Sequence, residues 1–319
     1  MSQDSQATST DKLQPPYFAG VAASPAGAHV GIVDDRGRTV WRFTEPTASR
    51  PGVQEILALV QKAAREANLG PAGIAGLGLC MPEAADVSEL ANECRLPVTR
   101  FNDVDAAAYG EQWVGAGREF HSLALITLDA AIGCGIVLGD QPGGENCRGS
   151  QLGHIIIDCK PGARLCACGQ PGHLAAYASA TALIDRIGEA LDAGRPSSLR
   201  NRLAKGQTPS LALVADEASS GDALSLEAIA ETARFVAVGL ASLMHTVDPS
   251  GILLAGPMTF GGSQTPLGRQ FLAWVREEIG RRAFPILTER TVVAFAALGE
   301  DAGWIGAAGL ARRHLTRSA

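Results

Sequence analysis

Hydrophobic and polar positions alternate with the two-residue period of β-strands in the first part of the chain, and a helical spacing follows. Strand-like runs occupy residues 17–22, 29–33 and 39–43, and turn-forming residues separate the last two. Between Val53 and Val60 the apolar residues fall on one helical stripe. This region therefore predicts a strand meander followed by an amphipathic helix.

Farther along the chain, short apolar runs alternate with longer segments of helical spacing. The apolar runs predict strands at 74–80, 97–101, 123–128, 134–138, 251–255 and 291–295. The helical spacings predict helices at 175–191, 226–247, 268–282 and 303–314. Both halves open with neighbouring strands and continue with strands and helices in turn, so we expect a duplicated α/β unit with a cleft between two lobes.

The length of 319 residues suits two lobes of roughly 150 residues better than one hydrophobic core. We place the N-terminal lobe at 17–119 and the C-terminal lobe at 120–299. The last helix, 300–316, is expected to return to the first lobe. Residues 1–16 are polar and end in two prolines, which is typical of a disordered tail.

Charge and composition narrow the class of partner. The formal net charge is −6, and no cluster of lysine and arginine overrides it, which argues against a nucleic-acid surface. No apolar run reaches the roughly 18 residues that a membrane span requires. Seven cysteines without a secretory signal pattern indicate a reducing cytoplasm with some thiols committed to a metal. A small molecule is the expected partner.

The clearest chemical signal lies in the segment 153–174, a loop rich in glycine and proline that concentrates nitrogen and sulfur donors. The donors are His154, Cys166, Cys168 and His173. Zinc prefers imidazole nitrogen and thiolate sulfur in a tetrahedron. Because four protein ligands leave no open position for a metal-bound water, we interpret the segment as a structural zinc knuckle.

Alternatives to this zinc site remain open from the sequence. Cys159 could replace one of the four ligands. Cys166 and Cys168 could form a redox pair, although their spacing is not C-x-x-C and a disulfide across one residue is strained. A loop that is merely rich in cysteine and histidine is the third interpretation.

Residues 102–105 read as the end of a strand that turns into the start of a helix. Asn102 or Asp103 could cap that helix, and the negative charge of Asp105 in the first turn would be stabilised by the helix macrodipole. Neither effect requires a catalytic role. By itself this pattern does not separate a cap from a functional carboxylate.

Several motifs occur at intervals along the chain: Asn102-Asp103, Gly153-His154, C-x-C-G-x-x-G at 166–172, AYAS at 176–179, RRAFPIL at 281–287 and GEDAGWIGAAGLARR at 299–313. Together they resemble the ROK family of bacterial sugar kinases, such as glucokinases and N-acylhexosamine kinases, and related sugar-responsive repressors. The resemblance extends from Tyr17 to His314. It implies the actin-like fold of sugar kinases and heat-shock ATPases, and a homodimer.

The resemblance also implies roles for individual residues. Asp103 falls on the position of the general base that takes a proton from the sugar hydroxyl attacking the γ-phosphate, a function commonly worth about 10²- to 10⁴-fold in rate. Asn102, Asp105, Gln151 and His154 fall among the candidates for substrate binding. The family's metal is held by one histidine and three cysteines, and His173 stands here at the third cysteine position.

The nucleotide motifs of the family are altered throughout. At the first phosphate loop, Ala22 replaces the expected carboxylate, and Pro25 has no N–H to offer a phosphate oxygen. At the second loop, residues 129–131 read Asp-Ala-Ala where Gly-Thr-Gly is expected. The third glycine-rich turn is reduced to Ala-Gly-Pro at 255–257.

The sugar site departs from the family pattern as well. Gln151 and Ala175 stand where the family has glutamates, and the chain is short between Glu83 and Pro97. We therefore interpret the protein as a cytoplasmic ROK homologue, or pseudokinase, that retains a structural Zn²⁺ and binds or transforms a small polar metabolite, sugar or sugar-like, with Asp103 as candidate base. Standard binding of ATP with Mg²⁺ is not expected.

Three other functions compete with this interpretation. One is an active but divergent ATP-dependent sugar kinase, and another is a non-catalytic binding or partner protein. A repressor is disfavoured, because only 16 polar residues precede Tyr17 where ROK repressors carry a helix-turn-helix domain.

Overall fold

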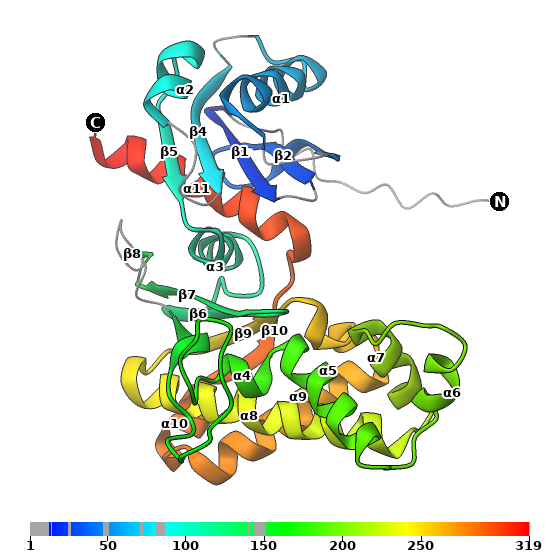
Figure 1. Cartoon of the computed structure of the whole chain (residues 1–319). Helices are drawn as coiled ribbons and strands as arrows, with labels where there is room; N and C mark the ends of the chain where they lie inside the picture. The colour runs from blue at the N-terminus through cyan, green and yellow to red at the C-terminus, as the bar shows by residue number, and fades with distance from the viewer. Residues whose placement is uncertain are drawn as a thin grey trace, which may run out of the picture. The chain divides into compact units, whose positions relative to one another are not determined.

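The computed structural model of the chain consists of two compact α/β units, each built around its own five-stranded sheet (Figure 1). The first unit runs to Asp103 and is completed by Gly303–Ala319, and the second runs from Val104 to Ala302. The structure describes residues 13, 15–24, 27–46, 51–70, 73–80, 87–139, 141–142 and 151–318. The predicted disordered tail, 1–16, lies almost entirely outside the described residues.

The first unit has the sheet order β3-β2-β1-β4-β5, in which β1 to β3 form the predicted antiparallel meander and β4 and β5 continue the sheet in parallel. Its elements are β1 (Tyr17–Ser24), β2 (Gly27–Val33), β3 (Thr39–Glu45), α1 (Val53–Glu66), β4 (Ile74–Cys80), α2 (Val87–Cys94), β5 (Val98–Phe101) and α11 (Ala302–Ser318).

Side chains on alternate positions of β1 serve opposite faces of this sheet. Ala19 and Val21 pack in the core that contains Ile56 of α1. On the other face, a Cβ atom at Gly20 would lie 1.9 Å from the carbonyl oxygen of Trp304. Glycine is required there because the backbone of α11 crosses the strand directly.

The second unit has the sheet order β10-β9-β6-β7-β8. Its strands are β6 (Ser122–Leu128), β7 (Ile132–Leu138), β8 (Gln141–Pro142), β9 (Gly251–Ala255) and β10 (Val292–Phe295). Its α-helices are α3 (Asp103–Trp113), α4 (Ala175–Ala178), α5 (Ala180–Asp192), α6 (Leu199–Leu203), α7 (Leu211–Ser219), α8 (Ala223–Val247), α9 (Pro266–Arg282) and α10 (Pro285–Arg290). The largest core of the described residues packs α5, α7, α8 and α9 with β6 and β9.

Helix α3 belongs to the second unit, so the observed boundary precedes the predicted one at 119/120. A Cβ atom at Gly135 of β7 would lie 2.2 Å from the Val104 carbonyl oxygen, which places the helix directly on the strand. The helix is also held at its far end by Glu111, which is fully buried. Packing of α3 against β7, which sequence spacing does not reveal, accounts for the difference.

The Glu111 carboxylate accepts three backbone hydrogen bonds inside the second unit. Oε1 accepts the N–H groups of Ala297 at 2.9 Å and Leu298 at 2.7 Å, and Oε2 accepts the N–H of Ala116 at 2.9 Å. Glu111 therefore ties α3 to a segment that follows β10.

The helix predicted at 175–191 is interrupted in the structure. Ser179 has extended backbone angles, and its Oγ accepts the N–H of Ala182, so it caps α5 and ends α4. The helices α6 and α7 were not predicted, because their segment is short and carries many polar residues. No helix in the described part of the chain is long and apolar enough to cross a membrane.

Candidate functional site

Two stretches of chain, 152–158 and 164–174, are joined by backbone hydrogen bonds. With the residues between them they form a loop, 152–174, which we call the metal-binding loop after its four candidate donors. The N–H of Leu174 donates to the Ile155 oxygen at 2.9 Å, and the N–H of Ile157 donates to the Gly172 oxygen at 2.8 Å. Gly172 has φ +79°, and a Cβ there would lie 1.9 Å from the Asp158 oxygen. Only glycine permits this close pairing of the two stretches.

A tight turn presents the two cysteine side chains of the loop. The N–H of Gly169 donates to the Cys166 oxygen at 2.8 Å, and Gly169 has φ +87°, a conformation that favours glycine. The N–H of Cys166 donates to the Gln170 oxygen at 2.9 Å. These bonds fold the backbone so that Cys166 and Cys168 approach the two histidines.

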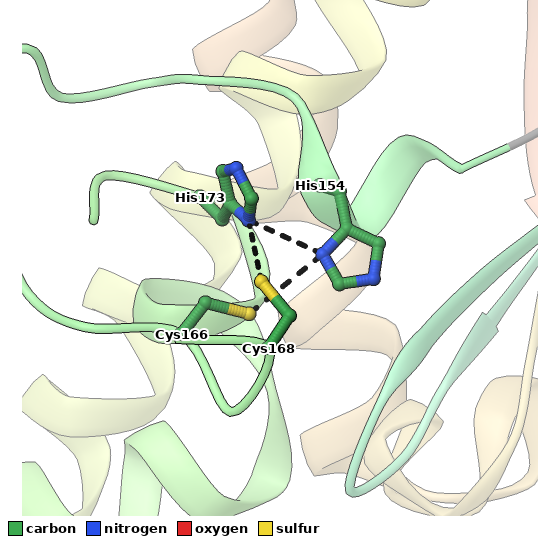
Figure 2. A group of neighbouring side chains, drawn as sticks. All are labelled: His154, Cys166, Cys168 and His173. Carbon is green, nitrogen blue, oxygen red and sulfur yellow. Dashed lines mark hydrogen bonds between the residues drawn. The ribbon is translucent and has the colours of Figure 1, made fainter. Parts of the chain in front are cut away.

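The four predicted donors meet in this loop, and their ligand atoms all lie within 4.8 Å of one another (Figure 2). Nδ1 of His154 is 3.2 Å from Nδ1 of His173 and 3.7 Å from Sγ of Cys166. Sγ of Cys168 is 3.3 Å from Nδ1 of His173. Around tetrahedral zinc, such donor atoms are separated by roughly 3.3–3.8 Å. The geometry can therefore hold a tetrahedral metal ion.

Cys159 lies outside this group of donors. Its side chain is exposed, and the described cluster of potential metal ligands consists of Cys166, Cys168 and the two histidines. Cys166 is buried, whereas His154 is exposed. A metal held by all four side chains would have no open position for a reactive water, so its role would be structural.

His154 is placed by the short turn Leu152–His154 at the end of the preceding segment. A Cβ atom at Gly153 would lie 2.6 Å from the Ile132 oxygen, so this glycine lets the turn sit against the start of β7. Gln151, directly before the turn, is exposed, and its carbonyl oxygen accepts the N–H of His154 at 2.9 Å. Gln151 and His154 are therefore both accessible.

The first turn of α3 separates the predicted carboxylates into an accessible and a buried one. Asn102 and Asp103 are exposed, whereas Asp105 is 6% exposed. Burial and the nearby charge of Asp105 raise the pKa of the Cys134 thiol to about 12. Burial, reinforced by the charge of Asp103, raises the pKa of the Cys80 thiol well above its ordinary value. Both thiols are therefore inert, and Asp103 is the carboxylate that a ligand could reach.

The turn after β6 is closed by its own hydrogen bonds. The N–H of Ala130 donates to Oδ1 of Asp129 at 2.7 Å, and the N–H of Asp129 donates to the Ala131 oxygen at 3.1 Å. Asp129 is exposed. Two backbone donors at this turn are thus satisfied within the turn, and a carboxylate occupies its tip.

The neighbouring strand β9 ends beside that turn, since Thr127 pairs with Ala255 in parallel register. Gly256 has φ +94°, and a Cβ there would lie 2.5 Å from the Leu128 oxygen, which explains the glycine by close backbone approach. Its carbonyl oxygen accepts the N–H of Thr259 at 3.1 Å. Pro257 offers no backbone donor.

The remaining predicted positions are described only in part. Ala22 lies in β1, paired with His29 and Cys80. Pro25 and the Glu83 segment lie outside the described residues. Ala175 begins α4.

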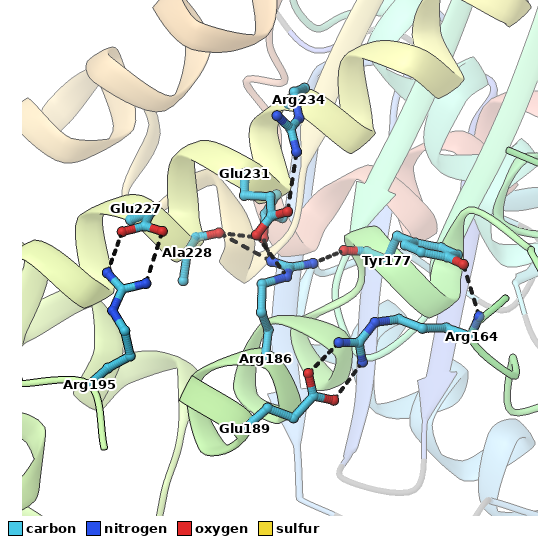
Figure 3. A network of polar contacts seen from close by, with 10 residues as sticks. Arg164, Tyr177, Arg186, Glu189, Arg195, Glu227, Ala228, Glu231 and Arg234 are labelled. Carbon is cyan, nitrogen blue, oxygen red and sulfur yellow. Dashed lines mark hydrogen bonds and ion pairs between the residues drawn. The ribbon is translucent and has the colours of Figure 1, made fainter. Parts of the chain in front are cut away.

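A network of charged and polar side chains, not predicted from the sequence, lies next to the metal-binding loop (Figure 3). Arg186 of α5 forms an ion pair with Glu231 at 3.2 Å and donates to Thr232 Oγ1 at 3.0 Å and to the Ala228 oxygen at 3.3 Å. It also donates to the carbonyl oxygen of Tyr177. Arg186 therefore links α4, α5 and α8.

Comparisons with known proteins cover most of the chain. A family model described as "ROK family" matches residues 52–314. A glucokinase of Streptomyces coelicolor is 28% identical over 307 residues, which cover 88% of this chain and 93% of the relative. A glucokinase of Halalkalibacterium halodurans is 30% identical over 226 residues, covering 70% and 66% respectively. A solved ROK family glucokinase from Streptomyces griseus, in complex with glucose and AMPPNP, has a TM-score of 0.72 at 26% identity and covers 93% of this chain and 100% of that one.

Proposed function

The chain belongs to the ROK family and has its actin-like fold, and we propose that it binds a sugar or sugar-like metabolite without standard phosphoryl transfer from ATP. Asp103 is the candidate general base for any chemistry on that ligand, because it is the accessible carboxylate at the start of α3. Asn102, Gln151 and His154 are proposed to contact the ligand. Asp105, being buried, is proposed to support the turn from within.

The turn after β6 carries this proposal. The family resemblance calls for a glycine-rich turn whose backbone N–H groups face phosphate. Here the Ala130 N–H is taken by the Asp129 carboxylate, which would also repel a triphosphate. Loss of one preorganised donor commonly costs about 3 kcal/mol in the transition state. Ala22 in β1 and Pro257 after β9 add losses at the other two nucleotide motifs.

The metal centre in this proposal is a structural zinc ion held by His154, Cys166, Cys168 and His173. Support comes from the donor separations and from the mixture of nitrogen and sulfur ligands. His173 would replace the family's third cysteine, and zinc accepts two histidines with two thiolates. The proposal also includes a homodimer, a cytoplasmic location and no nucleic-acid partner.

An active, divergent sugar kinase is the second candidate. Its support is the similarity to glucokinases, which extends over 88% of the chain in one case. For this candidate to hold, nucleotide phosphates would have to be bound by groups other than those of the β6 turn.

Calorimetry with AMPPNP and Mg²⁺ is expected to detect no binding tighter than about 1 mM, because each missing phosphate contact weakens binding and Asp129 opposes it. The glucokinase of Streptomyces griseus serves as the positive control. An Asp129→Gly chain should bind at least as well as the unaltered chain. Magnesium-dependent, sub-millimolar binding by the unaltered chain would establish the kinase candidate instead.

An Asp103→Asn variant separates a repurposed enzyme from a binding protein. Nuclear magnetic resonance of a panel of hexoses and N-acetylhexosamines would first reveal ligands and any conversion. If Asp103 is a general base, conversion should fall by at least about 100-fold with ligand affinity largely retained. Unchanged conversion would exclude this role, and ligand binding without conversion by the unaltered chain would favour the binding protein.

A further inference from the structure

The hydroxyl group of Tyr177 joins the two stretches of the metal-binding loop. It accepts the backbone N–H of Arg164 at 2.9 Å and donates to Oδ2 of Asp158 at 2.8 Å. A tyrosine hydroxyl can donate one hydrogen bond and accept others, so both contacts form together. Asp158 follows His154 in the first stretch, and Arg164 precedes Cys166 in the second.

Tyr177 is itself fixed to the helices beneath the loop. Its ring packs on Phe235 of α8 with centroids 5.1 Å apart, and the residue is 8% exposed. Its carbonyl oxygen accepts a hydrogen bond from Arg186, which is anchored on α8 in turn (Figure 3). The packing on Phe235 and the hydrogen bond from Arg186 therefore fix the position from which the Tyr177 hydroxyl donates and accepts its two hydrogen bonds.

Further contacts hold the same two points of the loop. The guanidinium of Arg164 forms an ion pair with Glu189 of α5 (Figure 3). Oδ1 of Asp158 accepts the N–H of Lys160 at 3.1 Å. Each stretch is thus tied at a defined residue, and the Tyr177 hydroxyl is a side-chain group that contacts both stretches, in addition to the backbone hydrogen bonds between them.

We propose that Tyr177 is a positioning residue for the metal centre, acting as a clasp that holds the donors of the two stretches at ligand distance before the ion binds. A loop that is ordered in advance loses less conformational entropy when a metal binds. The inference rests on the proposed metal binding by these four donors. It assigns a role to a hydroxyl that touches none of the four donor side chains, and zinc affinity separates this role from a purely structural one.

Zinc affinity of a Tyr177→Phe chain tests the clasp. Phenylalanine keeps the packing on Phe235 and removes the hydroxyl alone. Competition with a chromophoric chelator should show zinc binding weakened about 10-fold or more, the range seen when a supporting partner of a metal site is lost. Tyr17→Phe, the same chemical change in β1, is the matched control and should leave zinc affinity unchanged.

A double-mutant cycle with Asp158 identifies the hydrogen bond. Asp158→Asn can accept the bond from the Tyr177 hydroxyl only if its NH₂ group faces the N–H of Lys160, so an intermediate zinc affinity is expected, whereas Asp158→Ala should weaken zinc binding most. Because the two groups act as a unit, adding Asp158→Ala to Tyr177→Phe should weaken zinc binding by much less than the product of the two single effects.

Two outcomes count against the clasp and differ in meaning. If the unaltered chain binds zinc and Tyr177→Phe binds it within twofold, the hydroxyl has no positioning role, even if the thermal stability of the metal-free chain falls. If the unaltered chain binds no zinc, the proposed metal centre is wrong, and the positioning role proposed for Tyr177 is wrong as well.

Discussion

A Cys166→Ser chain is expected not to retain the proposed zinc ion and to lose several kcal/mol of stability, the largest effect anticipated for a single substitution. Structural zinc can contribute on the order of 10 kcal/mol to folding. Cys166 is the buried donor of the cluster. A water molecule therefore cannot easily take the place of its sulfur as a metal ligand. Metal content by mass spectrometry and thermal unfolding would measure both effects.

Cys159→Ser is the control for this experiment, because that thiol is exposed and lies outside the donor group. It should retain one metal per chain and the unfolding temperature of the unaltered protein. Metal loss from Cys159→Ser, or full metal in Cys166→Ser, would contradict the proposed ligand set.

Glu111→Ala is expected to destabilise the second unit by roughly 4 kcal/mol. The substitution removes three hydrogen bonds, from the N–H groups of Ala297, Leu298 and Ala116 to a fully buried carboxylate, and a hydrogen bond to a charged group contributes about 1.5–3 kcal/mol. Chemical denaturation, followed by a probe in the second unit, gives the free energy of unfolding.

Glu111→Gln distinguishes the hydrogen bonds from simple packing. Glutamine fills the same volume and can still accept the bonds from Ala297 and Leu298. Its amide NH₂ group would then face the donor N–H of Ala116, so an intermediate loss of stability is expected. A glutamine variant as stable as the unaltered chain, together with a loss below 1 kcal/mol for alanine, would show that the carboxylate is not required.

Most elements of the fold could be predicted because each depends on a local pattern. The strands 74–80 and 251–255 agree with β4 and β9 at both ends. The helix expected at 175–191 could not be placed correctly, since the cap formed by Ser179 depends on one side chain turning back to Ala182. The domain boundary was misplaced because residues far apart in sequence decide where α3 packs.

The candidate site divides in the same way. The four donors were recognised because nitrogen and sulfur ligands at short spacing state their chemistry directly, and the structure brings them together. Asp103 and Asp105 could not be told apart by spacing, although one is exposed and the other buried. In the sequence, Tyr177 was only part of the AYAS motif, and nothing in that motif indicated the contacts of its hydroxyl group.

By itself, then, the sequence determined the duplicated α/β plan, the family and the candidate donors of the metal-binding loop, with Cys159 left as an alternative. The α/β plan rests on periodicity, the candidate donors on residue type, and the family on the resemblance of short motifs, and all three are properties of short stretches. Only the tertiary structure decided that Asp129 closes its own turn, that Tyr177 joins two stretches of the loop, and that Glu111 reaches Ala297, 186 positions away. Such contacts form between specific side-chain and backbone atoms only after the elements have packed together. A local pattern of polar and apolar residues does not specify which atoms will come into contact.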